Sequence, residues 1–171
     1  SIGRDDAFSK KMYQRIVKEG HTLGMHSYSH QYKEIYQSMD AFQADYERIS
    51  NCLTAATGIK PLYYRFPGGS TEVTEKLQMT DLDAYFNAQG ASYFDWNVIA
   101  ANNTTDDVSV NKMVDSVMNG VALYDTSIVL MYDSVDRKMT AKSLDSILDY
   151  LLKNGYEILP IDENTIPIRH S

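Results

Sequence analysis

Short apolar runs alternate with amphipathic segments along the whole chain, and this alternation restricts the fold more than any other feature of the sequence. Apolar residues at helical spacing predict helices over residues 5–20, 38–58, 81–90, 107–120 and 140–155. Extended apolar segments predict strands over residues 21–27, 61–66, 91–100, 126–134 and 156–161. Short strands alternating with helices are typical of an α/β fold with a mainly parallel sheet or barrel. We therefore expect residues 1–171 to form a single α/β domain.

The expected helices define which apolar side chains should be buried. Their stripes are Phe8, Met12, Ile16 and Val17 in the first helix, Phe42, Tyr46, Ile49 and Leu53 in the second, and Leu144, Ile147, Leu148, Leu151 and Leu152 in the last. Ser38 is suited to cap the start of the second helix, and Gly58 is suited to end it.

Charge and cysteine content exclude several classes of function. The formal net charge of −7 at pH 7 argues against nucleic acid or an anionic membrane as a partner, because both require a basic face. The apolar run over residues 127–132 is far too short to span a bilayer. Cys52 is the only cysteine, so the chain cannot form an internal disulfide. A neutral or cationic ligand fits this composition better.

The segment GHTLGMHSYSH, residues 20–30, contains three of the four histidines. His26 and His30 lie four residues apart, so their rings can face one point on a helix or a tight turn. Neutral imidazole is a good ligand for zinc, cobalt or nickel, whereas the alternative is a pair of ordinary hydrogen-bonding histidines. A catalytic zinc site also needs a third protein ligand and a position for water. His21 could supply that ligand, or it could pack against or cap a neighbouring helix.

Two further motifs fall near the ends of expected strands. In RFPGGS, residues 65–70, Arg65 could bind a carboxylate with its planar guanidinium, or it could be a surface residue beside a turn. The following Pro67 and Gly68 either let the backbone approach a ligand or turn the chain. In FDWN, Trp96 is the only tryptophan, and Asp95 precedes it within an expected strand, where a charged residue needs a reason. The alternative is that Trp96 is buried in the core and Asp95 points to solvent on the other face of the strand.

In this order, the motifs resemble those of the polysaccharide deacetylase family, the NodB-homology domain, and the resemblance covers nearly the whole chain. HSYSH is similar to the family motif His-(Ser/Thr)-x-x-His, which implies that His26 and His30 are metal ligands. RFPGGS resembles the motif whose arginine positions the catalytic aspartate, so Arg65 takes that role. The same resemblance implies substrate contacts from Phe66, Pro67, Gly68 and Trp96.

The family resemblance also implies a fold and a reaction. The fold is a distorted (β/α) barrel, and the reaction is metal-assisted removal of an acetyl group from a glycan. The expected metal is divalent, with zinc first and cobalt or nickel as alternatives. In this chemistry the metal polarises the acetyl carbonyl and activates water, an aspartate is the general base, and a histidine is the general acid.

The family's opening motif, Thr-Phe-Asp-Asp, is absent from this sequence. It supplies the catalytic base and the third metal ligand, and we expect its position to precede SIGRDD at residues 1–6. Asp5 and Asp6 are instead expected at the cap and first turn of a helix. The expected fold is therefore a barrel that lacks its first strand region.

Two further positions depart from the family pattern. Tyr132 stands where the fifth motif, Leu-x-His-Asp, has its general-acid histidine, and phenols as a class titrate near pH ~10 against ~6.5 for imidazole. The fourth motif, Asp-x-x-Asp-Trp, matches either residues 92–96 or residues 99–103, and we favour the second register. It places Asn102 where the family has the aspartate that tunes the acid histidine.

Two functions follow as expectations. The first is a metal-dependent deacetylase that acts on peptidoglycan or a chitin-like glycan, with an extracellular or cell-surface location implied by the family. The second is a carbohydrate-binding or regulatory protein on the same scaffold without catalysis, which the replacements at Tyr132 and Asn102 favour. An acetylated polysaccharide is the expected partner in both cases.

Overall fold

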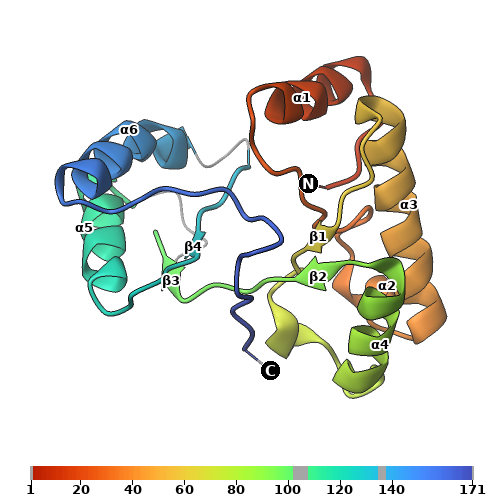
Figure 1. The fold of residues 1–171 in the computed structure, drawn as a ribbon. Coiled ribbons are helices and arrows are strands. Elements are labelled where there is room, and N and C mark those ends of the chain that lie inside the picture. Colours follow the sequence, from red (N-terminus) through yellow and green to blue (C-terminus); the bar gives the residue numbers. More distant parts are fainter. Residues whose placement is uncertain (1, 102–107, 135–137, 171) are drawn as a thin grey trace. The chain divides into compact units, whose positions relative to one another are not determined.

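The computed structural model describes residues 2–101, 108–134 and 138–170 (Figure 1). The helices are α1 (Ala7–Lys18), α2 (Tyr32–Ile35), α3 (Met39–Thr57), the 3₁₀ turn η1 (Ser70–Glu72), α4 (Met79–Gln89), α5 (Val110–Val121) and α6 (Lys138–Lys153). The strands are β1 (Tyr63–Tyr64), β2 (Ser92–Tyr93), β3 (Val98–Ile99) and β4 (Val129–Leu130). The chain divides into two compact units, one of Ser1–Asp95 with Pro160–Ser171 and one of Trp96–Leu159.

Parallel pairing organises the extended segments of the first unit. Strands β1 and β2 are parallel, with Tyr64 opposite Tyr93. Single parallel bridges extend this arrangement, because Met25 pairs with Tyr64 and Ile2 pairs with Ser27. In the second unit β3 and β4 are also parallel. The expected parallel α/β organisation is therefore confirmed within each unit.

Helix α3 forms where the sequence predicts it and with the predicted caps. The hydroxyl of Ser38 accepts a hydrogen bond from the backbone N–H of Ala41, at 3.2 Å. Gly58 ends the helix with φ of 77°, a left-handed conformation that a residue without Cβ adopts at no steric cost. The four predicted stripe residues Phe42, Tyr46, Ile49 and Leu53 are all fully buried.

Helix α1 is fixed at both ends by local hydrogen bonds. Asp6 caps its start by accepting from the backbone and the hydroxyl of Ser9, at 2.9 and 2.7 Å. Gly20 is left-handed at the other end, and the backbone N–H of His21 donates to the carbonyl of Ile16. His21 thus caps α1 through its backbone, while its side chain is exposed.

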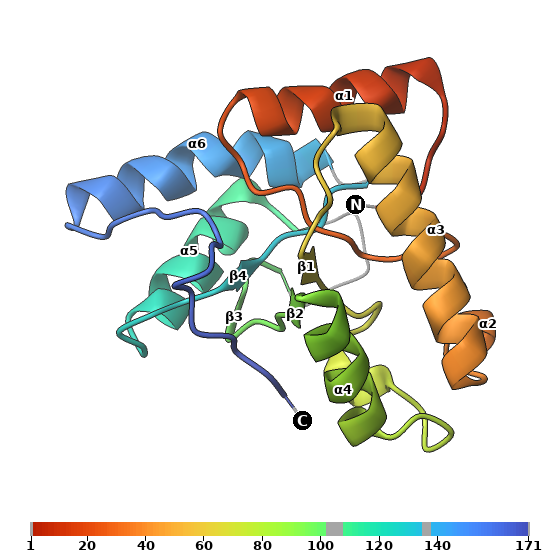
Figure 2. The same cartoon turned by 45° about the vertical axis from the view of Figure 1, so that its right-hand side comes forward.

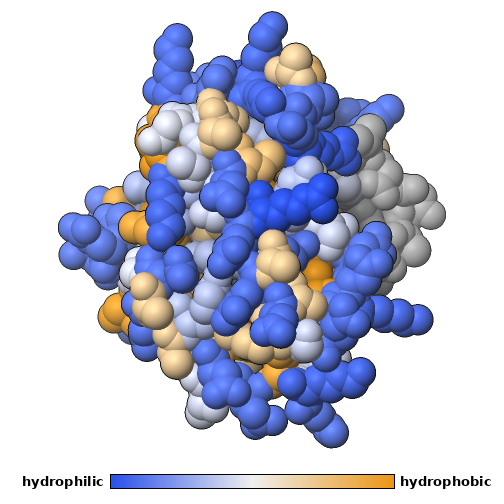
Figure 3. All heavy atoms as spheres, turned by 90° about the vertical axis from the view of Figure 1, so that its right-hand side faces the viewer, coloured by the Kyte–Doolittle hydropathy of each residue, from blue (hydrophilic) through white to orange (hydrophobic). Residues whose placement is uncertain are grey.

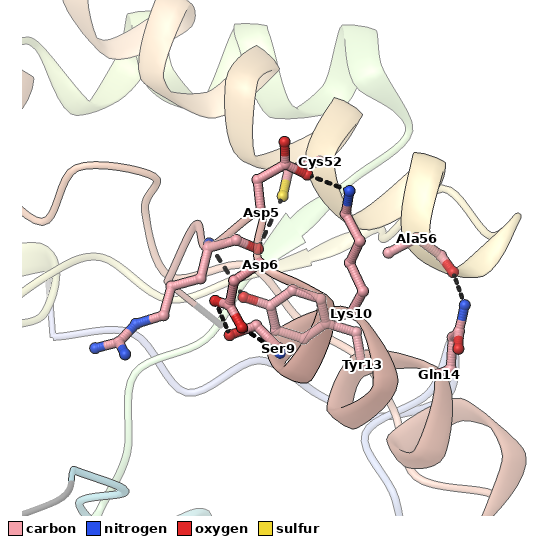
Figure 4. A network of polar contacts seen from close by, with 9 residues as sticks. Asp5, Asp6, Ser9, Lys10, Tyr13, Gln14, Cys52 and Ala56 are labelled. Carbon is pink, nitrogen blue, oxygen red and sulfur yellow. Dashed lines mark hydrogen bonds and ion pairs between the residues drawn. The ribbon is translucent and has the colours of Figure 1, made fainter.

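The segment before α1 is tied to α1 and α3 by the contacts in Figure 4. The hydroxyl of Tyr13 donates to the carbonyl of Ile2 at 2.8 Å and accepts from the backbone N–H of Arg4 at 3.2 Å. The thiol of Cys52, on α3, lies 3.6 Å from the carbonyl oxygen of Arg4. Asp5 forms an ion pair with Lys10 at 2.7 Å.

An aromatic cluster fills the core of the first unit. Its rings are fully buried and contact one another at centroid distances of 4.9–6.5 Å, and they belong to Tyr36, Phe42, Tyr46, Tyr64, Phe66, Phe86 and Tyr93. Aromatic side chains bury large apolar areas, so this cluster anchors α3 and α4 against β1 and β2. Hydrophilic residues cover most of the face that Figure 3 shows.

The second unit has a smaller core of aliphatic residues. Helices α5 and α6 lie side by side in both views of the ribbon (Figures 1 and 2), and they pack Val117, Val121 and Ile147 against Val98 of β3. Gly120 allows this contact, because a Cβ there would lie 2.6 Å from Cγ1 of Val98. No helix in the described part of the chain is long and apolar enough to cross a bilayer.

Several sequence predictions about burial and strands were wrong. Phe8 is 71% exposed, and Tyr13 is buried on α1 instead. On α6, Leu144 and Leu152 are exposed, whereas Ser143 is fully buried. The expected strand over residues 156–161 forms no ladder with any described residue, so it is not a strand in this structure.

The predicted single strand over residues 91–100 is also wrong, because two separate strands occupy it. β2 pairs in the first unit and β3 pairs in the second. The division between the units follows Asp95. Its side chain is fully buried, so the alternative in which it points to solvent is wrong.

Candidate functional site

His26 is held in the backbone between two anchored neighbours. The backbone N–H of Met25 donates to the carbonyl of Tyr63 at 2.8 Å, and the carbonyl of Met25 accepts from Arg65 at 2.9 Å. On the other side, the carbonyl of Ser27 accepts from the backbone N–H of Gly3 at 3.1 Å. The position from which the His26 side chain projects is therefore set by segments on both sides.

The rings of His26 and His30 meet through their Nε2 atoms, which are 3.2 Å apart. Nδ1 of His26 lies 2.8 Å from the carbonyl oxygen of Arg65. A carbonyl oxygen only accepts, so Nδ1 carries the proton and Nε2 of His26 presents its lone pair toward His30. In the metal-free protein His30 donates from its Nε2 to that lone pair.

Burial keeps both imidazoles neutral at pH 7. Desolvation lowers the pKa of His26 to about 4, against a smaller opposing effect from the hydrogen bond to Arg65. Desolvation also lowers the pKa of His30, although the charge of Asp45 opposes this shift. Neutral imidazole is the form that binds metals, so the environment favours ligation.

The spacing of the two Nε2 atoms fits a shared metal ion. Two nitrogen ligands of a tetrahedral zinc, each at ~2.0–2.1 Å from the ion, lie about 3.3 Å apart. The observed separation is 3.2 Å. The hydrogen bond from Nδ1 of His26 to a backbone carbonyl is the outer contact that fixes the tautomer of metal-binding histidines. Within the described ranges, no group of three or more His, Cys, Asp or Glu side chains is arranged around one point.

Arg65 contributes to the site with both its backbone and its guanidinium. Its carbonyl binds His26, and its side chain donates from Nε to the carbonyl of Phe94 at 3.2 Å and from Nη2 to the carbonyl of Asp95 at 3.5 Å. Desolvation by burial is the main effect on its pKa, which is lowered. These bonds hold the arginine against the segment that follows β2.

The RFPGGS loop is shaped by the core beneath it. The ring of Phe66 is fully buried among the aromatic cluster, so it supports the loop from below and presents no surface for a substrate. The hydroxyl of Tyr36 donates to the carbonyl of Pro67 at 2.8 Å. Gly68 is exposed at φ of 80°, and a Cβ there would lie 2.5 Å from Cγ of Glu72 and 3.0 Å from Cε2 of Tyr32.

Tyr32 is an aromatic residue near the histidine pair that sequence reasoning missed. Its ring contacts His30 edge-on, with centroids 5.4 Å apart, and the side chain is 38% exposed. A contact with Tyr36 at 6.0 Å fixes the ring from the core side. The signal in the sequence was its place two residues after His30, at the start of a short helix.

Asp95 is a buried structural carboxylate. It accepts from the backbone N–H and the hydroxyl of Ser70, at 2.9 and 2.5 Å, and from the backbone N–H of His170 at 2.9 Å. These bonds already use the carboxylate. The register of the fourth motif that starts at residue 99 stays a prediction. Asn102, the counterpart of the tuning aspartate in that register, lies outside the described residues.

Trp96 and Tyr132 belong to the second unit, whereas the histidine pair belongs to the first. Trp96 begins that unit and is half-buried. Tyr132 follows β4 by two residues, and its side chain is 43% exposed.

The structure resembles solved carbohydrate deacetylases. The catalytic domain of a peptidoglycan N-acetylglucosamine deacetylase from Eubacterium rectale ATCC 33656 is 30% identical in sequence, with a TM-score of 0.86 over 96% of this chain and 76% of that chain. The chain belongs to the polysaccharide deacetylase family. A family model described as polysaccharide deacetylase matches residues 2–86, which include the histidine pair and the Arg65 loop.

Two further comparisons agree with the assignment to the polysaccharide deacetylase family. A Streptococcus mutans CE4 esterase is 26% identical, with a TM-score of 0.81 over 92% of this chain and 70% of that chain. YheN of Bacillus subtilis (strain 168), whose name assigns it to the polysaccharide deacetylases, is 23% identical over 163 residues. The match covers 93% of this chain and 55% of YheN, so the chain spans about half the length of that relative. The predicted family and fold class, a distorted (β/α) barrel of the deacetylase type, are confirmed.

Proposed function

We propose that this polysaccharide deacetylase family protein is a metal-dependent hydrolase that removes acetyl groups from N-acetylated glycans of the peptidoglycan or chitin type. The observation that carries the proposal is the paired Nε2 atoms of His26 and His30, 3.2 Å apart, with the His26 tautomer fixed by Arg65. The similarity to a named peptidoglycan N-acetylglucosamine deacetylase supports this choice of glycan.

His26 and His30 would hold a divalent ion, with zinc favoured and cobalt or nickel as alternatives. When bound, such an ion supplies Lewis-acid polarisation of an acetyl carbonyl and lowers the pKa of water. The ligand set requires groups in addition to the two imidazoles, since a catalytic zinc ion takes three protein ligands.

The other residues of the site have supporting roles in this proposal. Arg65 holds His26 through its carbonyl and, by the family resemblance, orients the catalytic aspartate with its guanidinium. The exposed Gly68 borders the glycan, whereas Pro67 and the ring of Phe66 are buried and support that border from the core. Trp96 contacts the glycan. By the family resemblance, Tyr132 takes the position of the general-acid histidine, and Asn102 takes the position of the aspartate that tunes it. In this proposal residues 1–171 function as a single domain.

An acetylated glycan as substrate places the protein outside the cell or at the cell surface, because peptidoglycan and chitin-like polymers are found there. The net charge of −7 is compatible with an uncharged or partly deacetylated, cationic glycan and unfavourable for nucleic acid.

Metal binding and acetate release test this function together. The protein at its full encoded length is titrated with Co²⁺ in a calorimeter and then assayed for acetate release from N-acetylglucosamine oligomers and peptidoglycan. His26→Ala and His30→Ala should each lower Co²⁺ affinity at least ~10-fold and abolish release. The matched control is His21→Ala, because that exposed side chain lies outside the pair. Unaltered Co²⁺ binding in both variants would reject the metal site.

A second candidate is a glycan-binding or regulatory protein without catalysis. Tyr132 favours it, because a phenol is a poor proton donor and acceptor in the range where imidazole works. Tyr132→His separates the two functions. A gain of acetate release indicates a hydrolase whose acid position has been replaced, whereas continued inactivity with retained glycan binding indicates a binding protein.

A further inference from the structure

His30 is held in an unfavourable backbone conformation. Its φ of 55° lies in the left-handed region, and it is the only non-glycine residue with a positive φ in the described part of the chain. A side chain with Cβ is sterically disfavoured there, so neighbouring contacts must stabilise it. The bridges on either side of His26 end at Ser27 and do not reach His30.

The carboxylate of Asp45 accepts hydrogen bonds from the loop that leads to His30. Its Oδ2 accepts from the hydroxyl of Ser27 and from the backbone N–H of Tyr28, both at 2.8 Å. Its Oδ1 accepts from the backbone N–H of Ser29 at 2.9 Å. Three donors from consecutive residues thus converge on one carboxylate, and hydrogen bonds to a charged acceptor are about twice as strong as neutral ones.

Ser27 extends this set of contacts to the histidine itself. Its hydroxyl is fully buried and donates its proton to Asp45, so its lone pairs are available to accept from the backbone N–H of His30, at 2.8 Å. The chain of bonds from Asp45 through Ser27 to His30 fixes the backbone whose side chain places Nε2 beside His26.

The position of Asp45 is set by the core. It lies on α3 between Phe42 and Tyr46, whose rings are fully buried in the aromatic cluster. The carboxylate is therefore carried on a rigid helix, and the loop with His30 is ordered against it. Asp45 was not singled out from the sequence. The available signal was a charged residue one helical turn after Phe42 and next to Tyr46, beside the apolar stripe of the helix.

We propose that Asp45 is the positioning residue for the metal site: it orders residues 27–30 and thereby aims the His30 imidazole at the ion that His26 shares. This inference rests on the proposed metal site, since it concerns the same two ligands. Substitution of an outer contact that orients a metal-binding histidine lowers metal affinity about 10–100-fold. We expect that loss from Asp45→Asn.

The test measures both the metal and the loop. Co²⁺ affinity is measured by calorimetry for the wild type, Asp45→Asn and Glu47→Gln, a charge-matched control at an exposed position of α3. Amide hydrogen exchange of Tyr28, Ser29 and His30 is measured in EDTA. Asp45→Asn should bind Co²⁺ about 10–100-fold more weakly and exchange these amides faster. Glu47→Gln should match the wild type in both.

Ser27→Ala keeps the test decisive if Asp45→Asn fails to fold. This variant removes the hydroxyl that joins Asp45 to His30 and leaves the bonds from the Tyr28 and Ser29 amides to Asp45 in place. It should therefore weaken Co²⁺ binding and expose the His30 amide while the Tyr28 and Ser29 amides stay protected. Wild-type affinity in both variants overturns the inference and leaves the metal site intact. Absence of Co²⁺ binding in the wild type overturns the metal site instead, and unchanged amide exchange in Asp45→Asn then overturns the role of Asp45 as well.

Discussion

Nδ1 of His26 lies 2.8 Å from the carbonyl oxygen of Arg65, and this single contact sets which nitrogen of the ring faces His30. It joins two motifs that are 39 residues apart in the chain. The same contact opposes the desolvation of the ring without overcoming it, so the pKa of His26 falls to about 4. The pair is therefore neutral at the pH where a metal would bind.

The depressed pKa predicts how the stability of the metal-free protein depends on pH. The folded state binds fewer protons at His26 than the unfolded state, whose imidazole titrates near ~6.5. The contribution of neutral His26 to the free energy of unfolding is full above pH ~6.5. It is lost as the pH falls toward about 4, the pKa of His26 in the folded state. Complete loss amounts to on the order of 3 kcal/mol in the free energy of unfolding.

Urea unfolding in EDTA at pH 7.5 and pH 4.5 measures this effect. His26→Asn keeps a donor for the Arg65 carbonyl but has no titrating ring, so its stability should change less between the two pH values. His21→Asn is the control, because the exposed His21 should leave the wild-type difference unchanged. An equal pH dependence in His26→Asn and the wild type would contradict the prediction.

Gly3 is predicted to be intolerant of a side chain because of Tyr28. A Cβ at Gly3 would overlap the Tyr28 ring, and the Cζ of Arg48 lies over that ring at 3.8 Å from its centroid. Gly3→Ala should therefore lower the free energy of unfolding by ~1–3 kcal/mol, as overpacking does elsewhere.

A double-mutant cycle identifies the clash as the cause. Tyr28→Ala removes the ring, so adding Gly3→Ala to it should cost little in urea unfolding. The two substitutions would then show a large, favourable coupling energy. If Gly3→Ala is as costly without the ring as with it, backbone strain at residue 3 is the cause and the prediction is wrong.

Structural features that depend on neighbouring residues in the chain could be predicted from the sequence. The ends of α3 follow from Ser38 and Gly58 because capping is decided within one turn of helix. The stripe from Phe42 to Leu53 follows from helical periodicity for the same reason. The histidine spacing and motif order also sufficed to identify the family, since both are properties of the linear chain.

Features that depend on distant partners were not predicted. The break after β2 arises because Asp95 is bound by Ser70 and by the backbone of His170, 25 and 75 residues away. The role of Asp45 likewise depends on a loop 15 or more residues earlier in the chain. Nor does local periodicity reveal that Phe8 is exposed, because burial depends on what a helix face meets.

The buried tyrosines give an unusual pair of predictions about single hydroxyl groups. The hydroxyl of Tyr64 is buried with no hydrogen-bond partner among the described residues, and burial raises its pKa well above the usual range. An unpaired buried polar group costs about 1–3 kcal/mol. Tyr64→Phe should therefore leave thermal stability unchanged or raise Tm by a few degrees.

Tyr36→Phe is the matched control in the same aromatic cluster. Its hydroxyl is equally buried but donates to the carbonyl of Pro67 at 2.8 Å. Its removal leaves that carbonyl with one acceptor site unused and should cost ~1–2 kcal/mol, seen as a lower Tm. A destabilised Tyr64→Phe protein would show that its hydroxyl has a partner, such as a buried water.

The carboxylate of Asp95 should be more important for stability than any exposed ion pair of the same segment. It is fully buried and joins the start of η1 to the backbone of His170 near the end of the chain. Asp95→Asn replaces one acceptor oxygen with an NH₂ group. That group cannot accept a hydrogen bond, so it faces a donor of Ser70 or His170 unfavourably. We expect a loss of about 2–4 kcal/mol in the free energy of unfolding.

Asp83→Asn is the control for Asp95→Asn, because Asp83 also binds the C-terminal segment. It pairs with Arg169 at 3.2 Å, but both side chains are more than a third exposed. Exposed pairs contribute ~0–1 kcal/mol, so this variant should unfold almost as the wild type does. Hydrogen exchange at residues 168–170 adds a local measurement: Asp95→Asn should release these amides, while Asp83→Asn should not. Equal losses of stability in the two variants would show that the buried carboxylate has no special role.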